Sequence, residues 1–147
     1  MKKGANYVKY EFPSRSCNEV FARTAVAAFA SQLDPTLDEL IDIKTAVSEA
    51  VTNSIVHAYK ETIGVIYITV KLYDEGRLDI CIKDRGCGIP DVEAAMEPTF
   101  TTAGDGERAG LGFSVMRAFT DNLKVRSVPG RGTVVKMSKI IGKRRAC

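Results

Sequence analysis

Two polar side chains that could move a proton and bind a metal ion lie four residues apart, at Glu49 and Asn53. The segment 36–60 has helical periodicity, so this spacing puts both residues on one side of a helix, off its apolar stripe. A glutamate can accept a proton from a water or hydroxyl nucleophile, and an amide oxygen can ligate a hard cation such as Mg²⁺. The pair indicates an acid–base and metal site, while a solvated helix face is the alternative.

A second candidate is an aspartate followed by glycines, at positions 84–88 and at the end of a predicted strand. The alternation of that strand puts Asp84 on its apolar face, so a carboxylate reaches the core. A buried carboxylate needs a hydrogen-bond donor, which the amino group of a purine could supply, and Gly86 and Gly88 would let the backbone pass close to a flat ring. The alternative is a turn in which Asp84 bonds its own backbone.

A glycine-rich stretch from Gly104 to Gly112 is the third candidate, and it leads into a predicted helix over residues 113–119. Glycines before a helix expose backbone N–H groups that can cradle phosphates, and Arg108 could add a charged contact. The stretch has neither the GK[ST] of a Walker A loop nor the βαβ surroundings of a dinucleotide fold. By itself it is equally typical of a flexible surface loop.

The elements that must position these residues follow from periodicity and helix-start signals. Capping boxes at 16–19 and 36–39 predict the starts of two helices. We expect strands at 7–12, 65–73, 78–84, 123–128 and 133–140, and helices at 16–32, 36–60 and 113–119. This order predicts an α+β fold, a two-layer sandwich with helices on one face of a mainly antiparallel sheet.

Composition narrows the class of protein. With 147 residues, 45% of them hydrophobic, one globular domain over 1–147 is expected, ending in a basic tail at 139–147. The net charge of +3 depends on that tail, so the body is slightly acidic, which argues against nucleic-acid binding. Four cysteines without a CxxC and a single histidine argue against a zinc site. No membrane span or signal peptide is evident, so we expect a cytoplasmic protein.

The three candidates occur in a specific order: ExxxN on a helix, DxGxG after a strand, GxG before a helix, and Gly132-Thr133 on a late strand. This order resembles the ATP-binding boxes of the GHKL superfamily over nearly the whole chain. Four stretches are similar to the anti-sigma-F family of serine protein kinases in that superfamily, namely Phe21-Ala22-Arg23, Gln32-Leu33-Asp34-Pro35, Ser48-Glu49-Ala50-Val51-Thr52-Asn53 and Phe100-Thr101-Thr102. The resemblance implies the GHKL ATP-binding fold.

The resemblance also implies roles for the matched residues. Glu49 would be the general base that takes the proton of a substrate serine, and Asn53 would hold Mg²⁺ near the phosphates. Asp84 would bond the adenine amino group, with Thr133 helping through water. The remaining nucleotide contacts would come from the turn and from a lid at about 97–110 with the helix start after it: Gly86, Gly88, Thr102, Arg108, Gly110, Leu111, Gly112 and Phe113.

Two features of the sequence refine these roles. Family members often carry a basic residue just after Phe-Thr-Thr, where this chain has Ala103-Gly104, so that phosphate contact would fall to Arg108. A histidine kinase needs a separate helical segment with its phosphoacceptor histidine, for which 147 residues leave no room. We therefore interpret His57 as a packing residue of the nucleotide-binding helix.

A module of this kind acts on other proteins. The resemblance implies a homodimer that sequesters a sigma factor of the sigma-F type and phosphorylates an anti-anti-sigma protein with Mg²⁺-ATP, without contacting nucleic acid or membrane directly. Arg23 matches a partner-contact position of the family, and an exposed solvated arginine is the alternative. Two other functions stay open: a sigma-B-type stress-response kinase, which shares every motif, and a binding module that uses ATP only to set its shape or not at all.

Overall fold

Strands of alternating apolar and polar residues build the sheet in the computed structural model, which describes residues 6–96 and 112–142. The described strands are β1 (Asn6–Pro13), β2 (Val65–Leu72), β3 (Arg77–Asp84), β4 (Asn122–Val128) and β5 (Gly132–Ile140). They form a sheet of order β1-β2-β3-β5-β4 in which every neighbouring pair is antiparallel. Because side chains alternate along a strand, one face of the sheet is apolar and the other is polar.

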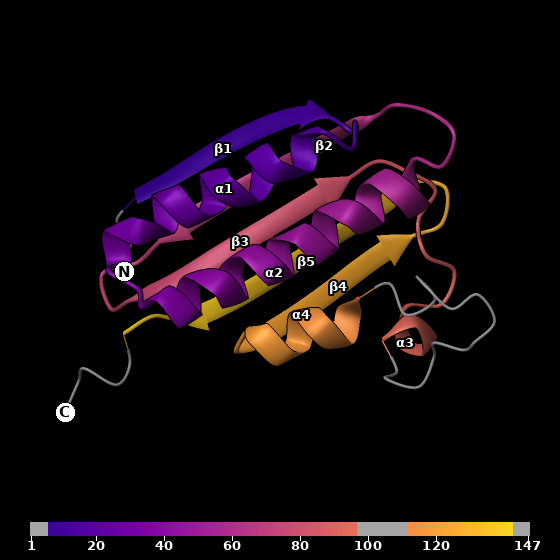
Figure 1. Ribbon diagram of the computed structural model, residues 1–147. Helices are drawn as coiled ribbons and strands as arrows, with labels where there is room; N and C mark the ends of the chain where they lie inside the picture. The colour runs from indigo at the N-terminus through magenta and orange to yellow at the C-terminus, as the bar shows by residue number, and fades with distance from the viewer. Residues whose placement is uncertain (1–5, 97–111, 143–147) are drawn as a thin grey trace.

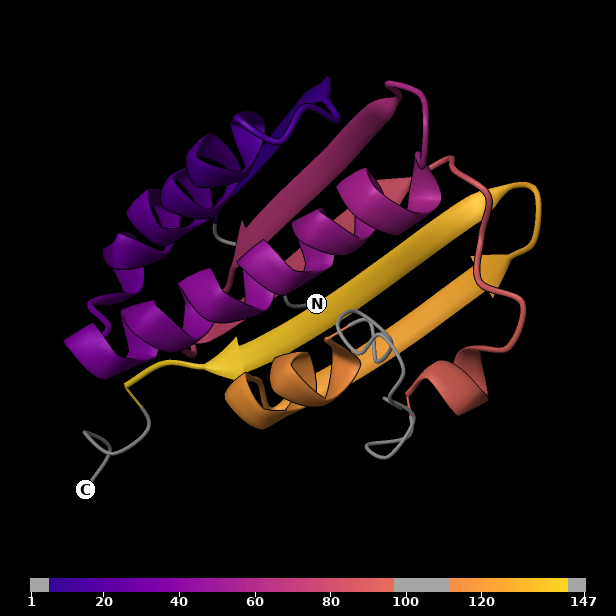
Figure 2. The ribbon, with the colours of Figure 1, turned by 45° about the vertical axis from the view of Figure 1, so that its right-hand side comes forward.

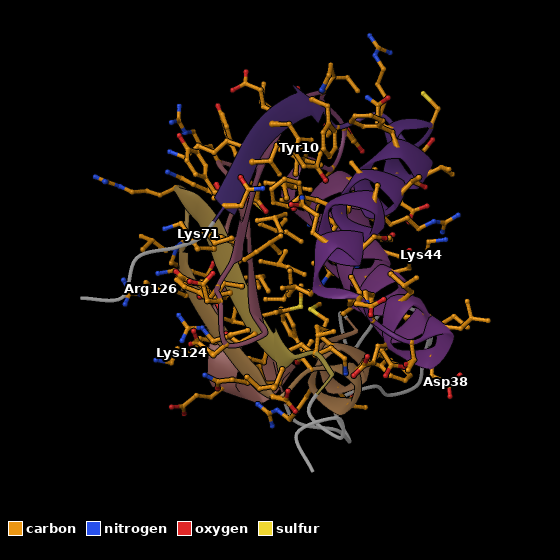
Figure 3. All side chains as sticks on the ribbon, turned by 90° about the vertical axis from the view of Figure 1, so that its left-hand side faces the viewer. Tyr10, Asp38, Lys44, Lys71, Lys124 and Arg126 are labelled. Atoms are coloured by element: carbon orange, nitrogen blue, oxygen red, sulfur yellow. The ribbon has the colours of Figure 1, made fainter. Side chains whose placement is uncertain are left out.

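The helices cover the apolar face (Figure 1). They are α1 (Asn18–Ala30) with the 3-10 turn η1 (Ser31–Leu33), α2 (Leu37–Asn53) with the π-helical turn η2 (Ser54–Ala58), α3 (Val92–Ala95) and α4 (Phe113–Phe119). In the side view of Figure 3, α1 and α2 stand on one side of the sheet and leave its other side open. This arrangement confirms the predicted α+β sandwich.

The core lies between α2 and the central strands. Val47 and Val51 of α2 are fully buried, as are the β2 and β3 residues that face them. Fully burying side chains of this size stabilises the fold by about 1.5–3 kcal/mol each. The apolar stripe of α2 therefore fixes the rotation of this helix, and with it the direction in which the polar residues of the same helix point.

The start of α2 is as predicted. Thr36 Oγ1 accepts a hydrogen bond from the backbone N–H of Glu39 at 3.1 Å, and Glu39 Oε1 accepts one from the backbone N–H of Thr36 at 2.9 Å. These reciprocal bonds satisfy two donors that a helix start leaves open.

The capping box expected at Ser16 was wrong. Helix α1 begins at Asn18, after Cys17, without a side-chain cap, and Glu19 N donates to the backbone oxygen of Ser16. The Glu19 carboxylate instead pairs with Arg23 at 3.3 Å. Arg23, one helical turn further along, thus binds the Glu19 carboxylate that the capping box would have used.

Three other boundaries need comment. The short helix α3 was not predicted, because four residues give no periodicity, although Asp91 caps it by accepting from Ala94 N at 3.0 Å. Lys139 belongs both to the expected strand at 133–140 and to the expected basic tail; it lies in β5, where its ammonium group donates to the backbone oxygen of Phe119 and contacts Asp42. The predicted lid at 97–110 falls outside the described residues. No described helix is long and apolar enough to cross a membrane.

The two predicted capping boxes provide a matched test. Thr36→Ala removes a formed cap and is expected to lower the free energy of unfolding by about 1 kcal/mol. Ser16→Ala removes a hydroxyl that caps nothing, so its effect should stay within about 0.5 kcal/mol. Urea denaturation of both variants measures the difference, and equal losses would show that the assignment of the two caps is wrong.

Candidate functional site

A pocket lies at the C-terminal end of α2, above the ends of the central strands. Figure 2 shows the chain after β3 passing this end of α2 and the β4–β5 hairpin on its way to α3. Helix α2 and η2 supply one wall, and the strands β3 and β5 supply the floor. The lining residues are Ala50, Asn53, Ser54, His57, Ala58, Asp84, Gly88, Ile89, Phe113, Thr133 and Val135. Residues from helix, strand, turn and the α4 start thus meet at one place.

The Asp84 carboxylate is the polar centre of the pocket floor. Asp84 is only 6% exposed. Oδ1 accepts from the backbone N–H groups of Gly86 at 3.0 Å and Thr133 at 3.2 Å, and Oδ2 accepts from the hydroxyl of Ser54 at 2.8 Å. A carboxylate oxygen has about two acceptor positions, so Oδ2 keeps one for a ligand. Asp84 therefore bonds its own turn, as one interpretation predicted, and also reaches the core, as the other predicted.

Ser127 ties the turn after β3 to the β4–β5 hairpin. Its hydroxyl accepts from Ile89 N at 2.7 Å, lies 2.8 Å from Thr133 Oγ1 and donates to the Gly132 carbonyl at 3.1 Å. In the same region Gly130 N donates to the Cys87 carbonyl at 2.7 Å. These bonds join the turn after β3 to the β4–β5 hairpin at the pocket rim.

The glycines of the turn serve the packing of the protein itself. A Cβ on Gly86 would overlap the backbone of Ala58, and a Cβ on Gly88, whose φ is +80°, would overlap the Val128 carbonyl. The expectation that both glycines make room for a flat ring is thereby modified: the close backbone approach that they permit is to η2 and to β4. Gly88 nonetheless also lines the pocket.

The π-helical turn η2 anchors the end of the helix to β3 and to the turn after it. Tyr59 N donates to the Ser54 carbonyl at 3.1 Å, which closes the wide turn, and the Ala58 carbonyl accepts from Cys87 N at 3.1 Å. The Tyr59 hydroxyl donates to the Val65 carbonyl and accepts from Arg85 N at 2.7 Å. Burial raises the pKa of Tyr59, so its hydroxyl stays protonated. Single π turns of this kind are frequent at functional sites.

Glu49 lies next to the start of α4. Gly112, with φ of +68°, immediately precedes that helix, and a Cβ at this position would overlap Oε1 of Glu49. The next residue, Phe113, is buried and lines the pocket. The carboxylate that could accept a proton is thus held beside the pocket, one helical turn from Asn53.

The structure brings most of the predicted site residues together. Those that lie in or beside the pocket are Glu49, Asn53, Asp84, Gly86, Gly88, Gly112, Phe113 and Thr133. Thr102, Arg108, Gly110 and Leu111 fall outside the described residues. Arg23 lies on α1, paired with Glu19, and does not line the pocket.

Sequence reasoning missed Ser54 and Ser127 as site residues. Ser54 follows directly after α2 and is only 3% exposed. The sequence did contain a signal for Ser54. Its position continues the apolar side of the helix, and a buried hydroxyl needs a hydrogen-bond partner such as the buried aspartate at the end of β3. No signal was available for Ser127, because its contacts depend on the fold of the hairpin.

Comparison with known proteins shows which family the chain is similar to. Residues 12–139 match the model of the histidine kinase-like ATPase domain. The chain is 56% identical over 140 residues to the anti-sigma F factor of Caldanaerobacter subterraneus subsp. tengcongensis, covering 95% of this chain and 97% of that protein. It is 45% identical over 142 residues to the anti-sigma F factor of Heyndrickxia coagulans, covering 96% and 97%.

Two solved structures have the same fold. The RsbU and RsbW domains of a Mycobacterium tuberculosis protein match with a TM-score of 0.67 and 15% identity, over 93% of this chain and 33% of that one. The catalytic domain of the histidine kinase ThkA matches with a TM-score of 0.56 and 17% identity, over 92% and 96%. The predicted GHKL fold is confirmed.

The contact between Gly112 and Glu49 can be tested with two glycine variants. Gly112→Ala and Gly130→Ala both place a side chain at positive φ, so each should cost about 1 kcal/mol of folding free energy. Only Gly112→Ala also displaces the Glu49 carboxylate, because nothing lies within 4 Å of a Cβ at Gly130. The carboxyl carbon resonance of Glu49 should shift in the first variant alone. An unchanged resonance in Gly112→Ala would rule out the contact.

Proposed function

The chain belongs to the family of anti-sigma F factors, and from this premise we propose that it is an Mg²⁺-ATP-dependent serine kinase that also sequesters a sigma factor. Its domain is of the GHKL kinase type. The pocket at Asp84 is the proposed ATP site. Beyond family membership we propose a reaction, a substrate serine and roles for Glu49, Asn53 and Asp84.

One observation carries the assignment of ATP. Asp84 is buried, both of its oxygens are engaged, and Oδ2 has a single donor, the Ser54 hydroxyl, among the described residues. An unfilled acceptor on a buried carboxylate suits a neutral N–H donor on a flat apolar group. The 6-amino group of adenine is such a donor, and Ile89, Val135 and Phe113 supply apolar surface around it.

Asn53 fits the role of a magnesium ligand. Mg²⁺ in nucleotide sites takes one or two protein oxygens and fills its shell with phosphate oxygens and water. The described residues contain no group of three or more His, Cys, Asp or Glu side chains that could hold a metal by themselves. A metal at Asn53 would therefore depend on the nucleotide, and it would offset the phosphate charge when bound.

Glu49 is the proposed general base. It takes the proton of the substrate serine while the serine oxygen bonds to the γ-phosphorus. The bond from that phosphorus to the bridging oxygen breaks, so the products are phosphoserine and ADP. The position of Glu49 beside Gly112, at the start of α4, supports this role, because the family resemblance puts the phosphates at this helix start.

The proposed protein partners are a sigma factor of the sigma-F type, an anti-anti-sigma protein that carries the substrate serine, and a second copy of the chain. Val20 and Phe21 of α1 are 54% and 56% exposed, next to Arg23. Exposed apolar residues beside an arginine are typical of protein interfaces and support α1 as a contact surface. Since a sigma factor acts with RNA polymerase, the proposal places the protein in the cytoplasm.

Phosphate transfer tests the catalytic proposal. The protein, Mg²⁺ and γ-labelled ATP are mixed with the purified anti-anti-sigma protein, and label on a partner serine is followed with time. Glu49→Gln should slow transfer by about 100-fold or more while ATP affinity stays within about twofold. Glu61→Gln, at an exposed position beyond η2, is the matched control and should transfer normally. Unimpaired transfer by Glu49→Gln would contradict the assignment of Glu49 as the general base. If the wild-type protein binds ATP but transfers no phosphate, a nucleotide-gated binding module is favoured instead.

Nucleotide affinity tests the adenine assignment separately. Asp84→Asn replaces an acceptor with an amide that can present a donor to the ligand, so ATP affinity should fall by about tenfold or more and the preference for ATP over GTP should narrow. Asp74→Asn, in the exposed β2–β3 turn, should bind as the wild type does. Calorimetric titration measures both variants, and unchanged affinity in Asp84→Asn would overturn the assignment.

A further inference from the structure

The face of the sheet that the helices leave open carries concentrated positive charge. Alternation along the strands turns one set of residues away from the helices. Seven basic side chains on this side are exposed: Lys9, Lys71, Lys83, Arg85, Lys124, Arg126 and Lys136. In Figure 3, Lys71, Lys124 and Arg126 point away from α1 and α2, whereas Lys44 and Asp38 lie on the helical side. We call these seven residues the basic face.

Few acidic groups balance this charge. The strand residues of the same side include two acids, Glu11 and Asp79, and Asp79 is already engaged by Arg77 and Ser138. Within residues 6–96 and 112–142, none of the seven cations of the basic face forms an ion pair. The whole chain has a net charge of only +3, so the remainder of the molecule is net acidic. The charge is therefore segregated to one side of the sheet.

The arrangement of the basic face works against folding stability. Lys124 and Lys136 are directly opposite each other in the β4–β5 ladder. Like charges in this position destabilise an antiparallel pair. Together with Lys9 and Lys71 they line a hollow in the sheet surface, among the polar residues Thr69, Asn122 and Ser138. A concave, positively charged surface focuses the field on an anion that enters it.

The aromatic residues of this side do not favour nucleic acid. Proteins that bind single strands stack bases on open aromatic rings. Here Arg85 lies over the Tyr67 ring, at 5.0 Å from its centroid, and Arg77 lies over the Tyr73 ring at 3.9 Å. Two tyrosines that could have stacked bases are thus covered by guanidinium groups. Of the aromatic residues described on this side, Tyr7 alone is exposed, at 63%, opposite Lys71. Seven exposed cations beside one open ring fit the carboxylates of a polypeptide better than a run of stacked bases.

We propose that the basic face docks an acidic segment of a partner polypeptide, with Lys124 and Lys136 at its centre. The surface lies on the opposite side of the sheet from the Asp84 pocket, so the interaction goes beyond the proposed kinase function and does not depend on it. A face-to-face pair of this chain is not the occupant, because the two basic faces would repel each other. Carboxylates of the bound segment would offset the repulsion between Lys124 and Lys136, which destabilises the sheet of the unbound protein.

A Glu-rich peptide with a fluorescent label is the probe, and binding to the full chain is followed by anisotropy over a range of salt concentrations. Lys136→Glu is the main variant. It should weaken peptide binding by about tenfold at low salt, and the wild-type affinity should fall steeply as salt is added. Lys44→Glu changes the net charge equally, but its site on α2 faces the other side, so it should leave binding within about twofold.

Thermal unfolding separates loss of binding from loss of structure. Lys136→Glu turns the repulsion with Lys124 into attraction, so this variant should melt at the same or a higher temperature than the wild type while it binds the peptide less well. Equal weakening by Lys136→Glu and Lys44→Glu would overturn the proposal, as would absence of peptide binding by the wild type. Tighter binding of an oligothymidylate of matched charge would overturn it in favour of nucleic acid.

Discussion

The buried Asp84 carboxylate is the constraint on which the rest of the site depends. A carboxylate that is 6% exposed requires donors, and it takes them from three separate elements: η2 through Ser54, the turn through Gly86, and β5 through Thr133. Each donor must sit within hydrogen-bond distance, so the three elements are fixed relative to one another. Among the described residues Oδ2 has one donor, Ser54, and the acceptor position that this leaves is the basis of the proposed selectivity for adenine.

Helix α2 connects these hydrogen bonds to the side of the pocket where Glu49 lies. Its apolar stripe is held by the core and its start by the Thr36 capping box, so the helix can neither rotate nor slide freely. The π turn then widens the helix at the point where Ser54 must meet Asp84. Glu49 and Asn53, on the preceding turns, take their positions from the same helix. The proposed base Glu49 and the proposed metal ligand Asn53 are therefore positioned by one helix, which the Ser54 hydroxyl joins to Asp84 on β3.

The sequence was sufficient where a signal is local or periodic. Strand alternation and the Thr36 capping box predicted the strands, the helices and the burial of Asp84, because each of these features depends on neighbours a few residues apart. It failed at Ser16, where Glu19 pairs with Arg23 instead of completing a capping box. It also could not predict that the glycines at 86 and 88 approach Ala58 and Val128, which are distant in the chain. Such contacts exist only after the fold has formed.

A comparison of nucleotides tests the central claim most directly, because it leaves the protein unchanged. Inosine triphosphate has the same ribose and phosphates as ATP but carries a carbonyl where adenine carries its amino group. If Asp84 Oδ2 accepts a hydrogen bond from that amino group, calorimetric titration should show ATP binding at least about tenfold more tightly than inosine triphosphate. Equal affinities would contradict the account, since the free acceptor of Asp84 would then have no part in recognising the nucleotide.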